Sequence, residues 1–159
     1  MAICSLKRFA DDEVFFDPTL PLPQPTGRRV AVMGAGPSGL TAAYFLARKG
    51  HAVTVYEAKA EPGGMLRYGL AEYRLPTAVV RSEVDAILRT GIELRTSSPV
   101  TLPELQQQGF DAIYLAAGAS QSKKIPVKGA DLPGVFGGLE FLRAARSGAV
   151  LSLASPVVV

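Results

Sequence analysis

The sequence predicts an α/β fold built on a doubly wound parallel sheet, and three observations support this prediction. Short apolar runs alternate along the chain with segments of helical periodicity, the pattern of strands and crossover helices. The run Val30–Met33 leads directly into a glycine-rich turn at residues 34–39, where a helix is expected to begin. The length of 159 residues suits one domain with a single buried core.

Residues 1–27 are predicted to be a lead-in to the packed domain. Residues 5–13 have helical character, whereas the connector at residues 17–27 contains four prolines within eight residues. Because proline lacks a backbone N–H and fixes φ, this connector is expected to be extended. We therefore expect the packed domain to occupy residues 28–155, and residues 156–159 to begin a further strand.

The first half of the domain is predicted to contain a strand, a helix and a second strand. The apolar run Val30–Met33 is typical of a parallel strand buried on both faces. Residues 37–49 carry apolar side chains at helical spacing, and Gly50 supplies the stop. Residues 52–56 form the next strand, and the right-handed crossover rule makes the two strands parallel neighbours.

The later elements follow from the same periodicities. Residues 59–76 are predicted to be a long polar loop that contains glycine. The sequence then predicts a helix over residues 77–89, a strand over 92–94, a short helix with a capping box at Thr101–Glu104 that ends near Gly109, a buried strand over 112–116 and a helix over 139–143.

The glycine-rich turn indicates a site for a dinucleotide. The pattern Gly34-x-Gly36-x-x-Gly39 is a weak signal alone, but here it follows a strand, opens a helix and precedes Glu57 by eighteen residues, counted from Gly39. Gly34 permits the tight turn, Gly36 lets a pyrophosphate approach backbone N–H groups, and Gly39 lets the helix pack closely, together with Ala43. The dipole of the helix favours the negative charge of the diphosphate.

Glu57 restricts which dinucleotide is bound. Its carboxylate accepts hydrogen bonds from a ribose hydroxyl pair and repels a 2′-phosphate, so the pattern favours FAD or NAD over NADP. The loop of about eighteen residues after Glu57 suits the longer FAD, because Gly63 and Gly64 allow close backbone approach and Arg74 offers a cation. A plain NAD domain with a loop exposed on its surface is the alternative.

These motifs resemble a known family. The stretch from Gly34 to Gly39, then Glu57 with residues 61–69 (Glu-Pro-Gly-Gly-Met-Leu-Arg-Tyr-Gly), and then residues 73–76 (Tyr-Arg-Leu-Pro), closely resemble the FAD domain of the glutamate synthase small (beta) subunit family. That family of NADPH-dependent FAD oxidoreductases also includes the flavin region of dihydropyrimidine dehydrogenase. The resemblance covers nearly the whole chain.

The resemblance implies a role for each candidate site residue. The FAD pyrophosphate is expected to bind at Gly34, Ala35, Gly36, Pro37 and Ser38, with Gly39 closing the turn, and Ala117 and Gly118 are expected to close over the diphosphate. The adenosine ribose is expected at Glu57 and Ala58, and adenine at the backbone of Val100. The flavin side is expected to contact Gly63, Gly64, Met65, Leu66 and Arg74. No residue is nominated as catalytic or as a metal ligand, because the flavin itself carries the chemistry.

The resemblance also implies parts that these residues do not contain. In the family, a second glycine-rich turn binds NADPH, and iron–sulfur cysteines lie upstream of the flavin domain. The sequence has one cysteine, Cys4, so an iron–sulfur cluster is expected only in an upstream domain or a partner. We expect the FAD portion of a longer electron-transfer enzyme, with an iron–sulfur protein or a larger catalytic subunit as partner. A non-catalytic FAD- or NAD-binding module is the alternative.

Composition excludes several other classes of protein. The net charge of +3 comes from scattered basic pairs, without the basic and aromatic clusters of nucleic-acid binders. No apolar run reaches the roughly 18 residues of a membrane span, and the N-terminal charges lie in the wrong order for a secretory signal. The sequence therefore predicts a cytoplasmic protein. The single histidine, His51, is expected to be an exposed turn residue.

Overall fold

The computed structural model describes residues 2–13, 23–149, 153 and 155–158. Its elements, in chain order, are α1 (Ile3–Glu13), β1 (Arg29–Met33), α2 (Pro37–Ala47), β2 (Ala52–Tyr56), α3 (Met65–Tyr68), α4 (Thr77–Leu88), β3 (Glu93–Arg95), α5 (Leu102–Gln107), β4 (Ala112–Leu115) and α6 (Gly138–Arg146). Within these described residues, none of the helices combines the length and apolar character that a membrane crossing requires.

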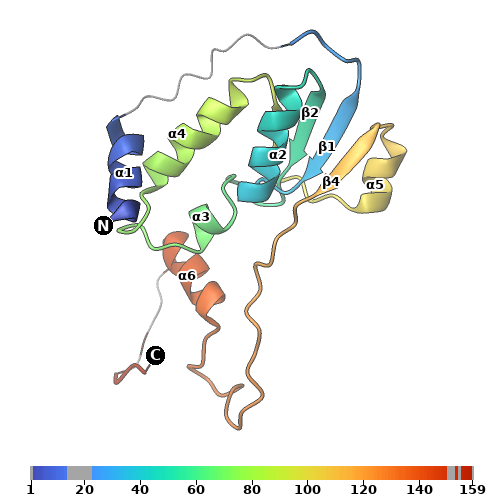
Figure 1. The fold of residues 1–159 in the computed structure, drawn as a ribbon. Coiled ribbons are helices and arrows are strands. Elements are labelled where there is room, and N and C mark those ends of the chain that lie inside the picture. The colour runs from blue at the N-terminus through green and yellow to red at the C-terminus, as the bar shows by residue number, and fades with distance from the viewer. Residues whose placement is uncertain (1, 14–22, 150–152, 154, 159) are drawn as a thin grey trace.

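The four strands form one parallel sheet in the order β3-β2-β1-β4 (Figure 1). The predicted parallel pairing of the first two strands is confirmed, since Val32 of β1 lies opposite Val55 of β2. Because all strands run the same way, their carboxyl ends meet at one edge of the sheet. The glycine turn follows β1 at that edge.

Helices cover both faces of the sheet, as a doubly wound fold requires. On one face, α2 and α4 place Leu40, Ala43, Ala47, Val80 and Val84 against Val32, Val53 and Val55. On the other face, Leu105 of α5 is fully buried against Ala31 and Tyr56. Successive residues of β1 therefore pack on opposite faces, which explains why that strand is apolar throughout.

Two expectations about local structure were wrong. The strand β4 was expected to be buried, but it pairs only with β1 at the sheet edge, and Tyr114 and Leu115 are exposed. The loop at 59–76 contains the one-turn helix α3, which is too short for periodicity to reveal. Residues 156–158 do not join the sheet, and the prediction that they begin a strand of a further domain stays a prediction.

The other predicted elements agree with the structure to within a few residues. The predicted capping box is present: the hydroxyl of Thr101 accepts from the backbone N–H of Glu104, whose carboxylate accepts from the backbone N–H of Thr101. His51 is half-buried rather than exposed, since its ring contacts the hydroxyl of Thr26 at 2.7 Å. Most of the proline-rich connector lies outside the described residues.

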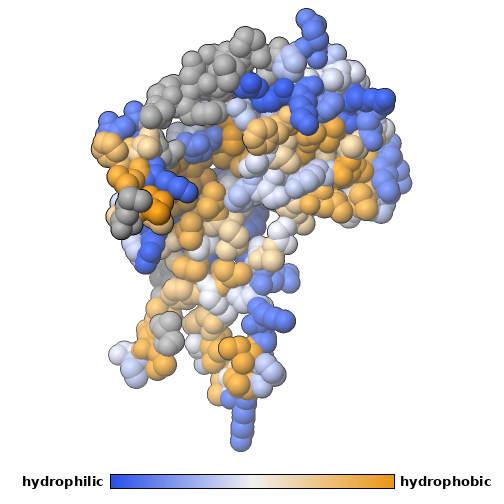
Figure 2. Space-filling model, in the orientation of Figure 1, coloured by the Kyte–Doolittle hydropathy of each residue, from blue (hydrophilic) through white to orange (hydrophobic). Residues whose placement is uncertain are grey.

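The chain leaves the sheet after β4 and comes back to the domain at α6, which lies beside α3. In Figure 1 this segment descends from β4 before α6 turns back and packs against α3. Figure 2 shows apolar and charged side chains interspersed on the same projecting part. Its exposed apolar residues are Ile125, Val127, Leu132, Val135 and Phe136.

Candidate functional site

The glycine turn after β1 has a backbone that only glycine accommodates. Gly34 has a φ of +107°, and a Cβ there would lie 2.4 Å from the carbonyl oxygen of Ala116. A Cβ on Gly39 would lie 1.9 Å from the carbonyl oxygen of Gly34. The backbone N–H of Gly34 donates to the carbonyl of Tyr56 at 2.8 Å, so the turn is tied to the end of β2. These contacts match the roles that the sequence assigned to the two glycines.

Helix α2 starts in this turn with its amino terminus open. Gly36 is the N-cap residue, and no side chain caps the helix. Pro37 has no N–H, and the next N–H groups of the first turn have no acceptor within the helix. A Cβ on Gly36 would meet only the Cα of Gly64, at 3.8 Å, so the space beside the turn is open. This arrangement fits a phosphate group.

Glu57 links the glycine turn to the chain after β2. Its side chain is buried, and its carboxylate accepts the backbone N–H of Ala35 at 2.8 Å and that of Lys59 at 2.9 Å. Each oxygen has a further lone pair, so the carboxylate can still accept a hydroxyl of a ligand. Glu57 is therefore a structural member of the turn as well as a candidate ribose ligand.

The second glycine pair packs against the first glycine turn. The N–H of Gly63 donates to the carbonyl of Ala35 at 2.7 Å. Gly64 has a φ of +53°, and a Cβ there would lie 2.7 Å from the Cα of Gly36. The two backbones touch without side chains between them. The segment after Glu57 therefore lies directly beside the dinucleotide turn, and α3 begins at this point.

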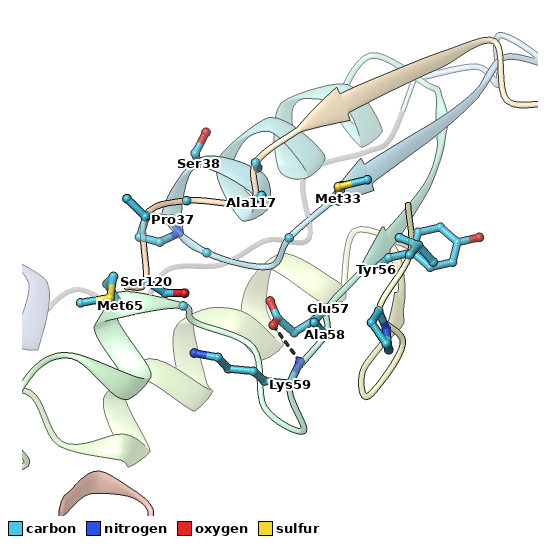
Figure 3. Close-up of a pocket in the computed structure, with 18 of the residues that line it drawn as sticks. Met33, Pro37, Ser38, Tyr56, Glu57, Ala58, Lys59, Met65, Ala117 and Ser120 are labelled. Atoms are coloured by element: carbon cyan, nitrogen blue, oxygen red, sulfur yellow. Dashed lines mark hydrogen bonds between the residues drawn. The ribbon is translucent and has the colours of Figure 1, made fainter. Parts of the chain in front are cut away.

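A pocket of about 310 Å³ lies where these segments meet (Figure 3). It is lined by Met33, Gly34, Gly36, Pro37, Ser38, Tyr56, Glu57, Ala58, Lys59, Gly64, Met65, Ser98, Pro99, Val100, Ala116, Ala117, Gly118, Ala119 and Ser120. Figure 3 shows Met65 and Ser120 on one side of it and Tyr56 on the other. The walls come from the ends of all four strands and from the start of α2 and α3.

Most of the predicted site residues line this pocket. Those that line it are Gly34, Gly36, Pro37, Ser38, Glu57, Ala58, Gly64, Met65, Val100, Ala117 and Gly118. Ala35, Gly39 and Gly63 are buried in the turns behind it, whereas Leu66 and Arg74 are exposed outside it. The ligand roles of all these residues stay predictions.

The structure adds pocket residues that the motifs did not name. Met33 and Tyr56 are the last residues of β1 and β2, and Ser98 and Pro99 follow β3. The rule that ligands of parallel sheets bind at the carboxyl ends of the strands could have found these residues. No comparable sequence signal marks Ser120, which follows β4 in an irregular segment.

Basic side chains lie around the pocket on the side of α3. Lys59 lines the pocket, and its Nζ lies 4.3 Å from the centre of the Tyr68 ring. Burial lowers the pKa of Lys59, the positive charge of Arg143 lowers it further, and Glu57 partly opposes both. The Nε of Arg67 donates to Glu61 at 2.5 Å, and this hydrogen bond is the main cause that lowers the pKa of the Glu61 carboxyl.

The described residues offer no metal centre. No group of three or more histidine, cysteine, aspartate or glutamate side chains lies close enough together in that part of the chain to hold an ion. The residues that line the pocket offer backbone amides, the hydroxyls of three serines and of Tyr56, one carboxylate and one ammonium group. These groups suit an extended ligand with phosphate and hydroxyl groups.

The comparison with known proteins agrees with the site. A family described as the NAD(P)-binding Rossmann-like domain matches residues 32–82. The chain is 38% identical to the NADPH-Fe(3+) oxidoreductase subunit beta of Geobacter sulfurreducens, over 99% of this chain and 25% of that protein. It is 40% identical to the glutamate synthase [NADPH] small chain of Mycobacterium tuberculosis, over 74% of this chain and 25% of that protein. The chain thus spans about a quarter of these relatives.

Solved structures show the same fold. Mycobacterium tuberculosis FprA in complex with NADPH superposes with a TM-score of 0.66 and 23% identity, over 76% of this chain and 29% of that one. A 2-naphthoyl-CoA reductase complex superposes with a TM-score of 0.62 and 25% identity, over 77% of this chain and 19% of that one. The motif resemblance is confirmed: residues 32–82 match the NAD(P)-binding Rossmann-like domain family, and the chain is similar in sequence to the glutamate synthase small chain and to the NADPH-Fe(3+) oxidoreductase beta subunit.

Proposed function

We propose that this chain binds FAD in the pocket at the carboxyl edge of its sheet, as the flavin-holding part of an NAD(P)H-dependent oxidoreductase. One observation carries the proposal: Gly63 and Gly64 pack backbone to backbone on the dinucleotide turn, so the long segment after Glu57 forms a wall of the pocket. Both NAD and FAD extend beyond the turn, but the flavin half of FAD, a ribityl chain with a three-ring system, is larger than the nicotinamide half of NAD. The second wall therefore suits FAD better.

The residues present fit such a ligand. The uncapped start of α2 and the open space at Gly36 suit the pyrophosphate, and the buried carboxylate of Glu57 can accept a ribose hydroxyl. Val100 and Pro99 line the pocket beyond Glu57, where adenine would lie. Met65 and Ser120 line the opposite side, which we assign to the flavin half.

The protein contributes binding and electrostatics, and bound flavin supplies the hydride and electron chemistry. Lys59 places a cation at the pocket, where it favours negative charge on a ligand. Glu57 disfavours a 2′-phosphate at the ribose. We infer that NADPH binds elsewhere in the complete protein, on a second nucleotide domain, and that electrons pass on to iron–sulfur centres or a partner subunit. Relatives named NADPH-Fe(3+) oxidoreductase and glutamate synthase support this inference.

The proposal is tested by visible absorption of the purified chain before and after addition of FAD, with NAD and NADP titrated in parallel. We expect the flavin bands to stay with the protein through gel filtration. The variant Gly36→Ala should lower FAD affinity, because a methyl group there fills the space for the pyrophosphate. Gly138→Ala is a matched glycine control, because Gly138 has no positive φ, a Cβ there meets nothing within 4 Å, and the residue lies outside the pocket.

Binding of NAD without FAD would overturn the assignment of the pocket to FAD.

Addition of NADPH without oxygen then tests the inference that NADPH binds on a second nucleotide domain. If reduction of bound flavin requires a second nucleotide domain, NADPH leaves the flavin bands of this chain unchanged, whereas dithionite bleaches them. Rapid bleaching by NADPH would contradict the inference that NADPH binds elsewhere.

A further inference from the structure

Helix α6 touches the segments that form two walls of the pocket. Its residues Arg143 and Arg146 are three apart and lie on one face of the helix. The guanidinium of Arg143 donates to the carbonyl of Ser120, which lines the pocket. Arg146 reaches the segment that contains α3, whose first residue, Met65, lines the same pocket.

Arg146 holds that segment at two points. Its Nε donates to the carbonyl of Arg67 at 3.0 Å, and its Nη2 donates to the carbonyl of Leu75 at 3.4 Å. It also pairs with the carboxylate of Glu72. The Arg146 side chain is only 5% exposed. A buried guanidinium is costly unless its donors find acceptors. Its Nε and Nη2 find theirs on the α3 segment, whereas Nη1 has the ion pair with Glu72 and no hydrogen bond.

The opposite wall is tied to the same helix by its amino-terminal half. The Glu140 carboxylate accepts the backbone N–H of Ser122 at 3.0 Å, and the N–H of Leu139 donates to the Ser122 hydroxyl at 3.0 Å. Together with the contact from Arg143 to Ser120, these bonds fix residues 120–122 on α6. One helix therefore connects two pocket walls that lie about fifty residues apart in sequence.

The α3 wall is anchored at its start by Gly63 and Gly64 on the dinucleotide turn. Within the wall, Arg67 pairs with Glu61, and Glu72 accepts the backbone N–H and the hydroxyl of Thr77. Helix α3 has only four residues, none of them fully buried, and a one-turn helix is not stable by itself. The hydrogen bonds from Arg146 add a link from this wall to α6.

We propose that α6 is a clamp in which Arg143 and Arg146 act as positioning residues, setting the spacing of the Met65 and Ser120 walls for the flavin half of the ligand. This role rests on the proposed FAD binding. The arginines act through Ser120 and the carbonyls of the α3 segment. They do not line the pocket. Arg146 matters more, since it joins both ends of its segment.

The test compares Arg146→Ala, Arg146→Lys and Arg143→Ala with the wild type. The control is Arg48→Ala, which removes the partly buried arginine that caps the carboxyl end of α2 and lies over the ring of Tyr44, away from the pocket. Two readouts are measured for each: the FAD dissociation constant by flavin fluorescence, and amide hydrogen exchange of residues 65–69 without FAD. The second readout does not depend on the ligand.

We expect Arg146→Ala to weaken FAD binding about tenfold and to speed exchange at residues 65–69, as loss of charged hydrogen bonds predicts. Arg146→Lys keeps the charge near Glu72 but not the two-pronged donor, so its effects should be intermediate. Arg143→Ala should weaken FAD binding less than Arg146→Ala, and Arg48→Ala should change neither readout. Unchanged exchange in Arg146→Ala would overturn the clamp.

Faster amide exchange in Arg146→Ala with an unchanged dissociation constant for FAD would show that Arg146 only stabilises the α3 segment. That result would overturn its proposed role in positioning the pocket walls for the ligand. Failure of the wild type to bind FAD would instead overturn the proposed function. In that case the exchange readout still decides whether α6 holds the wall.

Discussion

Replacement of Gly64 by alanine isolates the contact between the two glycine segments. The residue has a φ of +53°, and its Cβ would lie 2.7 Å from the Cα of Gly36, which is backbone and cannot rotate away. A non-glycine residue in such a conformation costs about 1–3 kcal/mol. Overpacking in a tight interior costs about another 1–3 kcal/mol. Gly64→Ala should therefore lower the free energy of unfolding by about 2–6 kcal/mol.

This loss is measurable by urea and thermal denaturation of the chain without ligand, followed by circular dichroism. A domain of this size loses roughly 2–4 °C in Tm for each kcal/mol, so we expect Tm to fall by roughly 4–24 °C. Gly36→Ala is the comparison, because its Cβ would lie at an ordinary 3.8 Å from the Cα of Gly64, on the other side of the same contact. It should cost at most about 1 kcal/mol, the loss from a poorer N-cap.

The two variants therefore separate fold from binding. Gly64→Ala should damage stability first, whereas Gly36→Ala should damage ligand affinity first. The packing argument fails if Gly64→Ala melts at the temperature of the wild type, or if Gly36→Ala is destabilised just as much. Either result would mean that the two glycine segments do not touch as the structure shows.

Three further predictions concern single side chains. In Glu57→Gln, one of the two backbone N–H donors, that of Ala35 or of Lys59, faces an amide NH₂ group instead of a carboxylate oxygen. The free energy of unfolding, measured by urea denaturation, should therefore fall by about 1–3 kcal/mol. An unchanged value would contradict the buried contacts. Thr101→Ala removes the capping partner of Glu104 and should cost about 1 kcal/mol, seen as a lower Tm, whereas no change would show that the cap is not formed in solution. Hydrogen bonds from Ser122 lower the pKa of Glu140 from 4.5 to about 2, so the stability that this contact contributes is complete above pH 4.5 and is lost as the pH falls through about 2. The Ser122 amide resonance in NMR spectra should follow that titration, and a midpoint near the ordinary value would refute the contact.

The local elements were predictable because they depend on neighbours in sequence. The capping box at Thr101 and the stop at Gly50 are decided by residues a few positions apart, and both agree with the structure. The buried strand β1 was recognisable because it is apolar at every position from Val30 to Met33. The burial of β4 was not predictable in this way, because an apolar run looks the same in the centre of a sheet and at its edge.

The features of the site also differ in whether they depend on residues that are close together in the sequence. The dinucleotide turn and its acidic partner Glu57 could be assigned from local sequence, since tight turns demand glycine whatever surrounds them. That Gly63 packs on the turn, that Arg74 lies outside the pocket and that Arg146 joins α6 to the α3 wall became evident only in the folded domain. These relations bring together residues far apart in the chain, and long-range contacts depend on the packing of the whole domain, which leaves no local pattern in the sequence.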